Sequence, residues 1–164
     1  MSSIILSKYN PKWTLKFEEE KKFLVSIIGK WLHGSIEHVG STSVIGLTAK
    51  PVIDIMFGIK SLENSNSAIE TLKQNGYNYS PYKRDVMHWF CKPSPEFRTH
   101  HLHLIPYGSN LWKERIIFRN ILRTDSQIAN EYVKLKKELI DLYKEDRETY
   151  TEKKWHFIQS ALGK

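Results

Sequence analysis

One aspartate stands in an otherwise apolar segment: Asp54, within the run from Val52 to Ile59. Such a run is typical of a strand that is covered on both faces. A carboxylate in these surroundings costs several kcal/mol unless it is paired, hydrogen-bonded or bound to a metal ion. Asp54 is therefore the first candidate for a catalytic or metal-binding residue, and a buried structural ion pair is the alternative.

A Gly-Ser-Thr turn, residues 40–42, precedes Asp54 by about a dozen residues. Glycine lets the backbone turn or approach a ligand closely. The N–H groups and hydroxyl of such a turn can hold phosphate oxygens. A strand aspartate can then hold a divalent cation against that phosphate. The spacing of Gly40, Ser41, Thr42 and Asp54 thus predicts a metal-assisted phosphate site, with an ordinary turn as the alternative.

Two histidines are candidates to complete a metal shell. His101 and His103 alternate in a short apolar segment, so they share one face of an expected strand. Imidazoles with one carboxylate suit Zn²⁺, Mn²⁺ or Fe²⁺ better than Mg²⁺, and an imidazole can also contact a phosphate directly. We expect Asp54, His101, His103 and Glu37 as metal ligands and Asp54 with His103 as catalytic residues. Simple packing of the histidines is the alternative, and Glu37 competes with its strand neighbour His38 to face the site.

Two basic residues are candidates for phosphate contacts. Lys50 stands just before the Asp54 strand, where a loop cation can meet a triphosphate. Arg98 precedes the histidine segment, and arginine favours bidentate phosphate contacts. Arg119 and Arg123, four residues apart on an expected helix, could form a further phosphate-facing pair. Solvated surface charge is the alternative for all four.

The elements that position these residues follow from hydrophobic periodicity and turn signals. The segments Thr124–Gln127 and Thr149–Glu152 have the form of capping boxes that open helices. The pattern predicts one α+β domain, residues 1–164, with a small mixed sheet flanked by helices and a helical C-terminal third. We expect helices at about 13–31, 61–75, 111–122, 125–143 and 150–162, and strands at about 36–39, 52–59, 77–82, 87–92 and 101–106.

Composition narrows the class of protein. The chain has 164 residues, of which 40% are hydrophobic and 12% aromatic, as expected of a folded domain. No apolar run approaches the roughly 18 residues of a membrane span, and the segment from Met1 to Lys8 lacks the pattern of a signal peptide. The single cysteine, Cys91, excludes an internal disulfide and a cysteine cluster for zinc. We expect a cytoplasmic location and no membrane partner.

The net charge of +7 indicates anionic ligands without fixing their size. The basic residues are spread along the chain and form no basic block. Nucleic acid therefore remains possible but is not favoured over a small anionic substrate.

Several blocks of the chain, in order, resemble the signature of the GrpB family. This resemblance runs from about Tyr9 to the end of the chain. It implies the nucleotidyltransferase superfold and a similarity to a domain fused to some bacterial dephospho-coenzyme A kinases, but it names no substrate. The blocks are Glu37–Ile55, His100–Leu104, Tyr107–Ser109, Phe118–Arg123, Tyr132–Lys136 and Tyr150–Lys154.

Met56 departs from the superfold pattern, which has a second carboxylate at this position. Because a thioether does not bind Mg²⁺, a two-metal site would lack one ligand. The resemblance implies a nucleoside triphosphate as substrate, a divalent cation (Mg²⁺ or Mn²⁺, with Zn²⁺ possible) and nucleotidyl transfer to an unidentified acceptor. A module that binds a nucleotide or anion without catalysis, and a His/Asp metal enzyme of another reaction type, are the alternatives.

Overall fold

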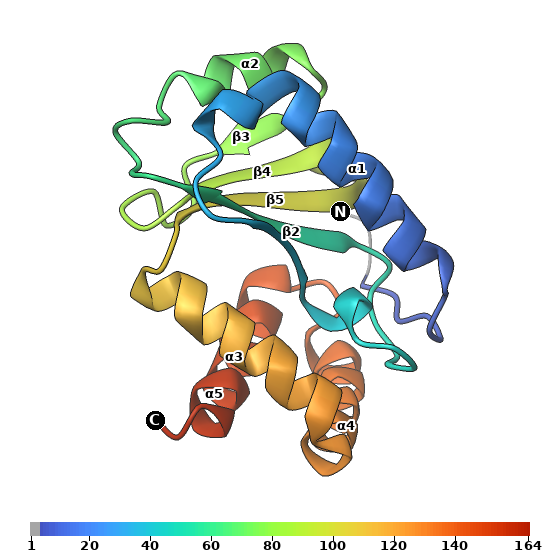
Figure 1. Cartoon of the computed structure of the whole chain (residues 1–164). Coiled ribbons are helices and arrows are strands. Elements are labelled where there is room, and N and C mark those ends of the chain that lie inside the picture. Colours follow the sequence, from blue (N-terminus) through green and yellow to red (C-terminus); the bar gives the residue numbers. More distant parts are fainter. Residues whose placement is uncertain (1–3) are drawn as a thin grey trace.

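A five-stranded mixed sheet, in the order β1-β2-β5-β4-β3, forms the centre of the computed structural model (Figure 1). The structure describes residues 4–164. The first three residues of the expected domain, which are also the start of the segment Met1 to Lys8, lie outside the described residues. The central strands β2 and β5 run parallel, and the other neighbouring pairs are antiparallel. The strands are β1 Ile36–Val39, β2 Ile53–Ile59, β3 Asn78–Ser80, β4 His88–Pro93 and β5 Arg98–Pro106.

Helices cover both faces of this sheet. Figure 1 shows α1 and α2 over one face, and the three C-terminal helices below the other. The expected α+β class, with a mixed sheet and a helical C-terminal region, is confirmed. The helices are α1 Lys12–Ile28, α2 Ala68–Gln74, α3 Asn110–Thr124, α4 Ser126–Tyr143 and α5 Arg147–Ala161.

The side chains of β2 alternate between the two faces of the sheet, and this alternation determines the face on which Asp54 lies. Ile55 and Phe57 pack into the core beneath α1 and α2. Met56 belongs to a second cluster that includes Trp112 of α3. Because successive strand residues point to opposite faces, Asp54 shares the face of Met56 and lies towards the C-terminal helices.

Helix α2 starts later than its sequence pattern predicts, at Ala68 instead of near Ser61. The Ser61 hydroxyl accepts a hydrogen bond from the N–H of Asn64 (3.0 Å), and the Ser65 hydroxyl donates to the Ser61 carbonyl (2.8 Å). Such local bonds offer the backbone an alternative to helical pairing. The stretch before α2 therefore forms turns.

Aspartates, not the threonines of the expected capping boxes, begin the last two helices. The Asp125 carboxylate accepts from the N–H of Ile128 (3.1 Å), and the Asp146 carboxylate accepts from the N–H of Thr149 (3.0 Å). Thr124 is instead the last residue of α3. A carboxylate satisfies a free N–H and also interacts favourably with the helix dipole, which explains this choice.

Within residues 4–164, no helix has both the length and the hydropathy that crossing a bilayer requires.

Candidate functional site

Three side chains from the two parallel strands converge on the face towards the C-terminal helices. Asp54 of β2 is paired with His101 of β5, and His103 lies two residues further along the same face. The Asp54 Oδ1 atom lies 3.1 Å from His101 Nδ1 and 3.5 Å from His103 Nε2. One possible ligand atom from each residue lies within 4.8 Å of the others. The structure therefore brings together the aspartate and the two histidines that the sequence singled out.

The Gly40 turn lies directly against this carboxylate. Gly40 follows β1 with φ 71° and ψ −179°, a backbone conformation that is essentially restricted to glycine. A Cβ atom at this position would lie 2.5 Å from Asp54 Oδ2. Both the backbone conformation and the close approach thus require glycine, and they place the following residue, Ser41, beside the acidic group.

The ionisation states follow from burial and hydrogen bonding. Burial raises the pKa of Asp54, but its hydrogen bonds with His101 and His103 outweigh burial and hold the pKa well below its usual value. Burial, reinforced by the charge of Arg115, lowers the pKa of His103 to about 4. Burial also lowers the pKa of His101, despite the opposing effect of Asp54. At neutral pH the carboxylate is therefore charged and both imidazoles are neutral, the states in which they can bind a cation.

The geometry fits a metal ion well at Asp54 and His101. Two ligands that each lie about 2.1 Å from one ion, at tetrahedral or octahedral angles, are roughly 3.0–3.4 Å apart. The separation of 3.1 Å between Asp54 Oδ1 and His101 Nδ1 falls in this range. His101 Nε2 is buried and has no hydrogen-bond partner among the described residues. A cation between Oδ1 and Nδ1 would replace the hydrogen bond seen here and would need the proton of the neutral His101 ring on Nε2.

His103 fits a metal ion less well, because Arg115 occupies its other ring nitrogen. Arg115 Nη1 lies 2.9 Å from His103 Nδ1. Since a guanidinium only donates hydrogen bonds, Nδ1 must accept, and the proton of the neutral ring is on Nε2, facing Asp54. A histidine that ligates through Nε2 would need its proton on Nδ1. His103 can thus bind a metal only if Arg115 releases it.

Glu37 is engaged elsewhere, so the geometry does not support its expected role as a metal ligand. Its carboxylate accepts hydrogen bonds from Arg119 Nη1 (2.9 Å) and from the Ser35 hydroxyl (3.1 Å). His38, the next residue on β1, points the opposite way and stacks on Phe17 of α1 at 4.8 Å. Of the two candidates on β1, Glu37 faces the C-terminal helices, but Arg119 holds it outside the Asp54 group.

The residues expected to bind phosphate differ in whether their side chains are already engaged in contacts within the protein. Thr42 is 2% exposed, and its hydroxyl donates to the Val52 carbonyl at 3.1 Å, so it supports the turn from inside. Arg98 Nε donates to the Pro95 carbonyl (2.9 Å) and its guanidinium lies over the Trp89 ring. The ammonium group of Lys50, by contrast, makes no hydrogen bond with any residue of the described range.

Two further lysines, which the sequence interpretation missed, lie on the C-terminal helices. Lys136 of α4 is 3% exposed, and its Nζ donates to Ser41 Oγ (2.9 Å) and to the Thr48 carbonyl (3.1 Å). Lys154 of α5 is partly buried, and burial lowers its pKa. A signal for Lys136 was available: it follows the apolar residue Tyr132 by four positions, so it occupies a core position on the helix.

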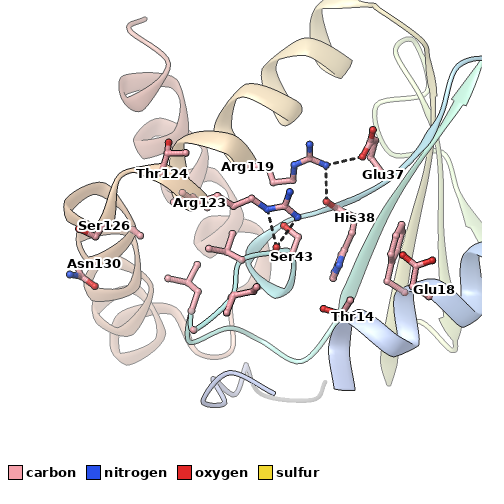
Figure 2. A pocket seen from close by; sticks show the side chains of 17 residues that line it. Thr14, Glu18, Glu37, His38, Ser43, Arg119, Arg123, Thr124, Ser126 and Asn130 are labelled. Carbon is pink, nitrogen blue, oxygen red and sulfur yellow. Dashed lines mark hydrogen bonds and ion pairs between the residues drawn. The ribbon is translucent and has the colours of Figure 1, made fainter. Parts of the chain in front are cut away.

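A cavity of about 810 Å³ lies beside β1 (Figure 2). Asp54, His101 and His103 are not among the residues that line it. Arg119 and Arg123 of α3 line it, together with Glu37 and Ser43. The Arg123 guanidinium donates to the Ser43 carbonyl through Nε (3.1 Å) and Nη2 (2.9 Å), as Figure 2 shows. Both arginines thus tie α3 to the strand and the turn, so the pair is engaged in structural contacts.

Known proteins are similar to this chain along nearly its whole length. The sequence profile of a family described as GrpB protein matches residues 3–164. The chain is 34% identical to the glutamate-rich protein GrpB of Alkalihalophilus pseudofirmus, across 98% of this chain and 94% of the relative. It is 33% identical to the UPF0157 protein YqkA of Bacillus subtilis, where the match covers 93% of this chain but only 44% of the relative.

A solved structure has the same fold. The crystal structure of conserved protein GrpB from Enterococcus faecalis superposes with a TM-score of 0.83 at 30% sequence identity. The superposition covers 97% of this chain and 98% of that chain, so it includes both the sheet and the C-terminal helices.

Substitution of Gly40 by alanine tests the close approach of the turn to Asp54. We expect Gly40→Ala to lower the free energy of unfolding by about 1–3 kcal/mol, because the new methyl group meets Asp54 Oδ2 in a strained backbone conformation. Gly46→Ala is the control, since Gly46 also has a positive φ (83°) but nothing lies within 4 Å of its added Cβ. The cost of Gly40→Ala should fall in an Asp54→Ala background; an equal cost in both backgrounds would contradict the contact.

The lowered lysine pKa values predict how stability depends on pH. Burial and neighbouring lysines lower the pKa of Lys50 and of Lys136 to about 7, against an ordinary value near 10.5. Between these values the unfolded chain binds more protons than the folded chain, so stability should rise as pH increases from about 7 to about 10. Melting temperatures measured in phosphate-free buffer should show this rise.

The Lys136→Met variant should have a smaller pH dependence over the same window, because it removes one of the shifted groups. Lys137→Met, on the exposed face of the same helix, should retain the wild-type slope. A melting temperature that does not change between pH 7 and 9.5 in the wild type would contradict the assigned environment of these lysines.

Proposed function

Because the chain belongs to the GrpB family, we propose that it binds a nucleoside triphosphate with a divalent cation and transfers a nucleotidyl group to an acceptor. The observation that carries the proposal is the position of an ionised aspartate directly against the Gly40 turn, with His101 Nδ1 3.1 Å from its Oδ1 atom. Phosphate oxygens and a cation need these two kinds of group side by side.

Asp54 and His101 are the proposed ligands of the cation, with Mn²⁺ or Mg²⁺ as the ion and Zn²⁺ as an alternative. A mixed nitrogen and oxygen donor set favours Mn²⁺ or Zn²⁺ over Mg²⁺. A bound cation supplies charge neutralisation and polarisation of the phosphoryl group. Ser41 and Lys50 contact the phosphates in this proposal.

His103 acts through its hydrogen bonds in this proposal. Its Nε2–H faces Asp54 and its Nδ1 accepts from Arg115, so it links the carboxylate to a cation on α3. Arg115 thereby stands near the reacting phosphate and can stabilise negative charge there. His103 is a positioning residue while this contact persists.

A second candidate function is a binding module that keeps the fold without catalysis. Met56, where the superfold pattern has its second carboxylate, is fully buried in a cluster with Trp89 and Trp112. A thioether packed in this way supplies no ligand, so a second metal ion lacks a binding group. This observation favours nucleotide binding with little or no nucleotidyl transfer.

Substitution of Asp54 by asparagine tests the proposed cation site. We expect Asp54→Asn to weaken Mn²⁺-dependent binding of a nucleoside triphosphate by about 100-fold or more, because a metal ligand loses its charge. Isothermal titration calorimetry measures the effect, and circular dichroism verifies that the variant remains folded. Asp85→Asn, in the exposed turn before β4, is the control and should bind as the wild type does.

Unchanged Mn²⁺-dependent binding in Asp54→Asn would reject the cation site. Release of pyrophosphate from a nucleoside triphosphate, with an acceptor from a cell extract, would decide for the enzyme over the binding module. Tight stoichiometric zinc or iron in the purified protein would instead favour metal-assisted chemistry of another type.

A further inference from the structure

Three lysines from separate parts of the chain lie close enough to Asp54 for its charge to affect them. Lys50 lies in the loop before β2, Lys136 on α4 and Lys154 on α5. The charge of Asp54 raises the pKa of each of the three. The charges of Lys50 and Lys154 in turn lower the pKa of Lys136. Lys136 Nζ also lies 3.1 Å from the carbonyl of Thr48, two residues before Lys50, so the three lysines belong to one region beside the Gly40 turn.

This group has more positive charge than the residues around it neutralise. Lys136 bonds only to the neutral oxygens of Ser41 and Thr48, and its ammonium lies over the Tyr132 ring. The Lys154 ammonium lies over the Tyr150 ring at 4.8 Å, and in the part of the chain that the structure describes neither Lys50 nor Lys154 forms a salt bridge. Asp54 acts on all three lysines but is itself hydrogen-bonded to the histidines.

A buried cluster of this kind is costly in the free protein. Removing an ammonium group from water is unfavourable unless it is paired, and like charges add to the cost. Burial accordingly lowers the pKa of Lys50 and of Lys136 to about 7, the direction expected of cations that lack counter-charges. An anion with several charges would provide the missing partner for all three.

We propose that Lys50, Lys136 and Lys154, together with Ser41, form a binding site for a polyphosphate group of at least two linked phosphates. The proposal rests on the proposed function, since it assigns the residues that hold the phosphate chain of the nucleotide. Lysine suits this role because its flexible stem lets a point charge follow different phosphate oxygens. Ser41 Oγ, already bonded to Lys136, directs the hydroxyl of the Gly40 turn to the same place.

The burial of these three lysines favours a small anion over a macromolecule as the ligand. Lys136 is only 3% exposed, and Lys50 and Lys154 are both partly buried. A nucleic-acid backbone or an acidic protein surface would need cations that project into solvent. A single phosphate, in contrast, carries too little charge to match three lysines from three elements.

The site also joins the two halves of the fold. Ser41 and Lys50 lie on segments next to the sheet, whereas Lys136 and Lys154 belong to helices of the C-terminal third. A polyphosphate bound between them would bridge these parts and stabilise the folded chain. The C-terminal helices thus contribute ligand contacts in addition to covering the sheet.

Binding of inorganic tripolyphosphate, with EDTA present to exclude metal ions, tests the proposal. Calorimetry should show that Lys154→Met and Lys136→Met each raise the Kd for tripolyphosphate by about tenfold or more, the usual effect of losing a charged contact. Lys154→Met should also have a higher melting temperature than the wild type without ligand, because charge repulsion is relieved. Lys153→Met and Lys137→Met, exposed neighbours on the same helices, are the matched controls and should bind as the wild type does.

Wild-type affinity for tripolyphosphate in Lys154→Met and in Lys50→Gln would overturn the proposal. Because Lys50 and Lys154 are partly exposed, these two variants test the lysine site even if Lys136→Met does not fold. Equal affinity for orthophosphate and tripolyphosphate would overturn the assignment of a polyphosphate. Lysine-dependent tripolyphosphate binding without any Mn²⁺-dependent nucleotide binding would support this site while rejecting the proposed function. The reverse pattern would reject the lysine site alone.

Discussion

The hydrogen bond between the ionised Asp54 carboxylate and His101 is the interaction on which the rest of the site depends. It stabilises the charge of a partly buried carboxylate, whose pKa burial by itself would raise. It orients His101 so that the opposite ring nitrogen stays without a partner. The Gly40 turn then has no room for a side chain, because the carboxylate fills that space.

The balance of charge around Asp54 sets this site apart from one built for two metal ions. Carboxylates are scarce: Met56 is apolar and Glu37 is paired with Arg119. Cations are plentiful, since Arg115 contacts His103 and Lys136 contacts the turn. Such a balance suits a strongly negative ligand and no more than one divalent cation.

The C-terminal helices have a double role in this arrangement. Their apolar residues pack on the segment after the Gly40 turn, in a cluster that joins Val44 and Leu47 to Phe118 and Tyr132. Their lysines and arginines reach the polar side of the same turn. The similarity to GrpB proteins extends over the sheet and these helices alike, as expected if both parts build one site.

The sequence by itself determined the fold class, most elements and the three central residues, because these depend on local patterns. Alternation along a strand put His101 and His103 on one face, and a charge within an apolar run marked Asp54. Local patterns misplaced the start of α2 and the caps of α4 and α5, where nearby side chains compete for the same backbone N–H groups.

Only the tertiary structure decided the partners of each charge. The pairing of Glu37 with Arg119, of His103 with Arg115, and of Lys136 with Ser41 joins residues on different elements. Which helix residue reaches which strand depends on how the C-terminal helices dock on the sheet. That docking is fixed by the packing of many side chains at once, so no periodicity in the chain records it.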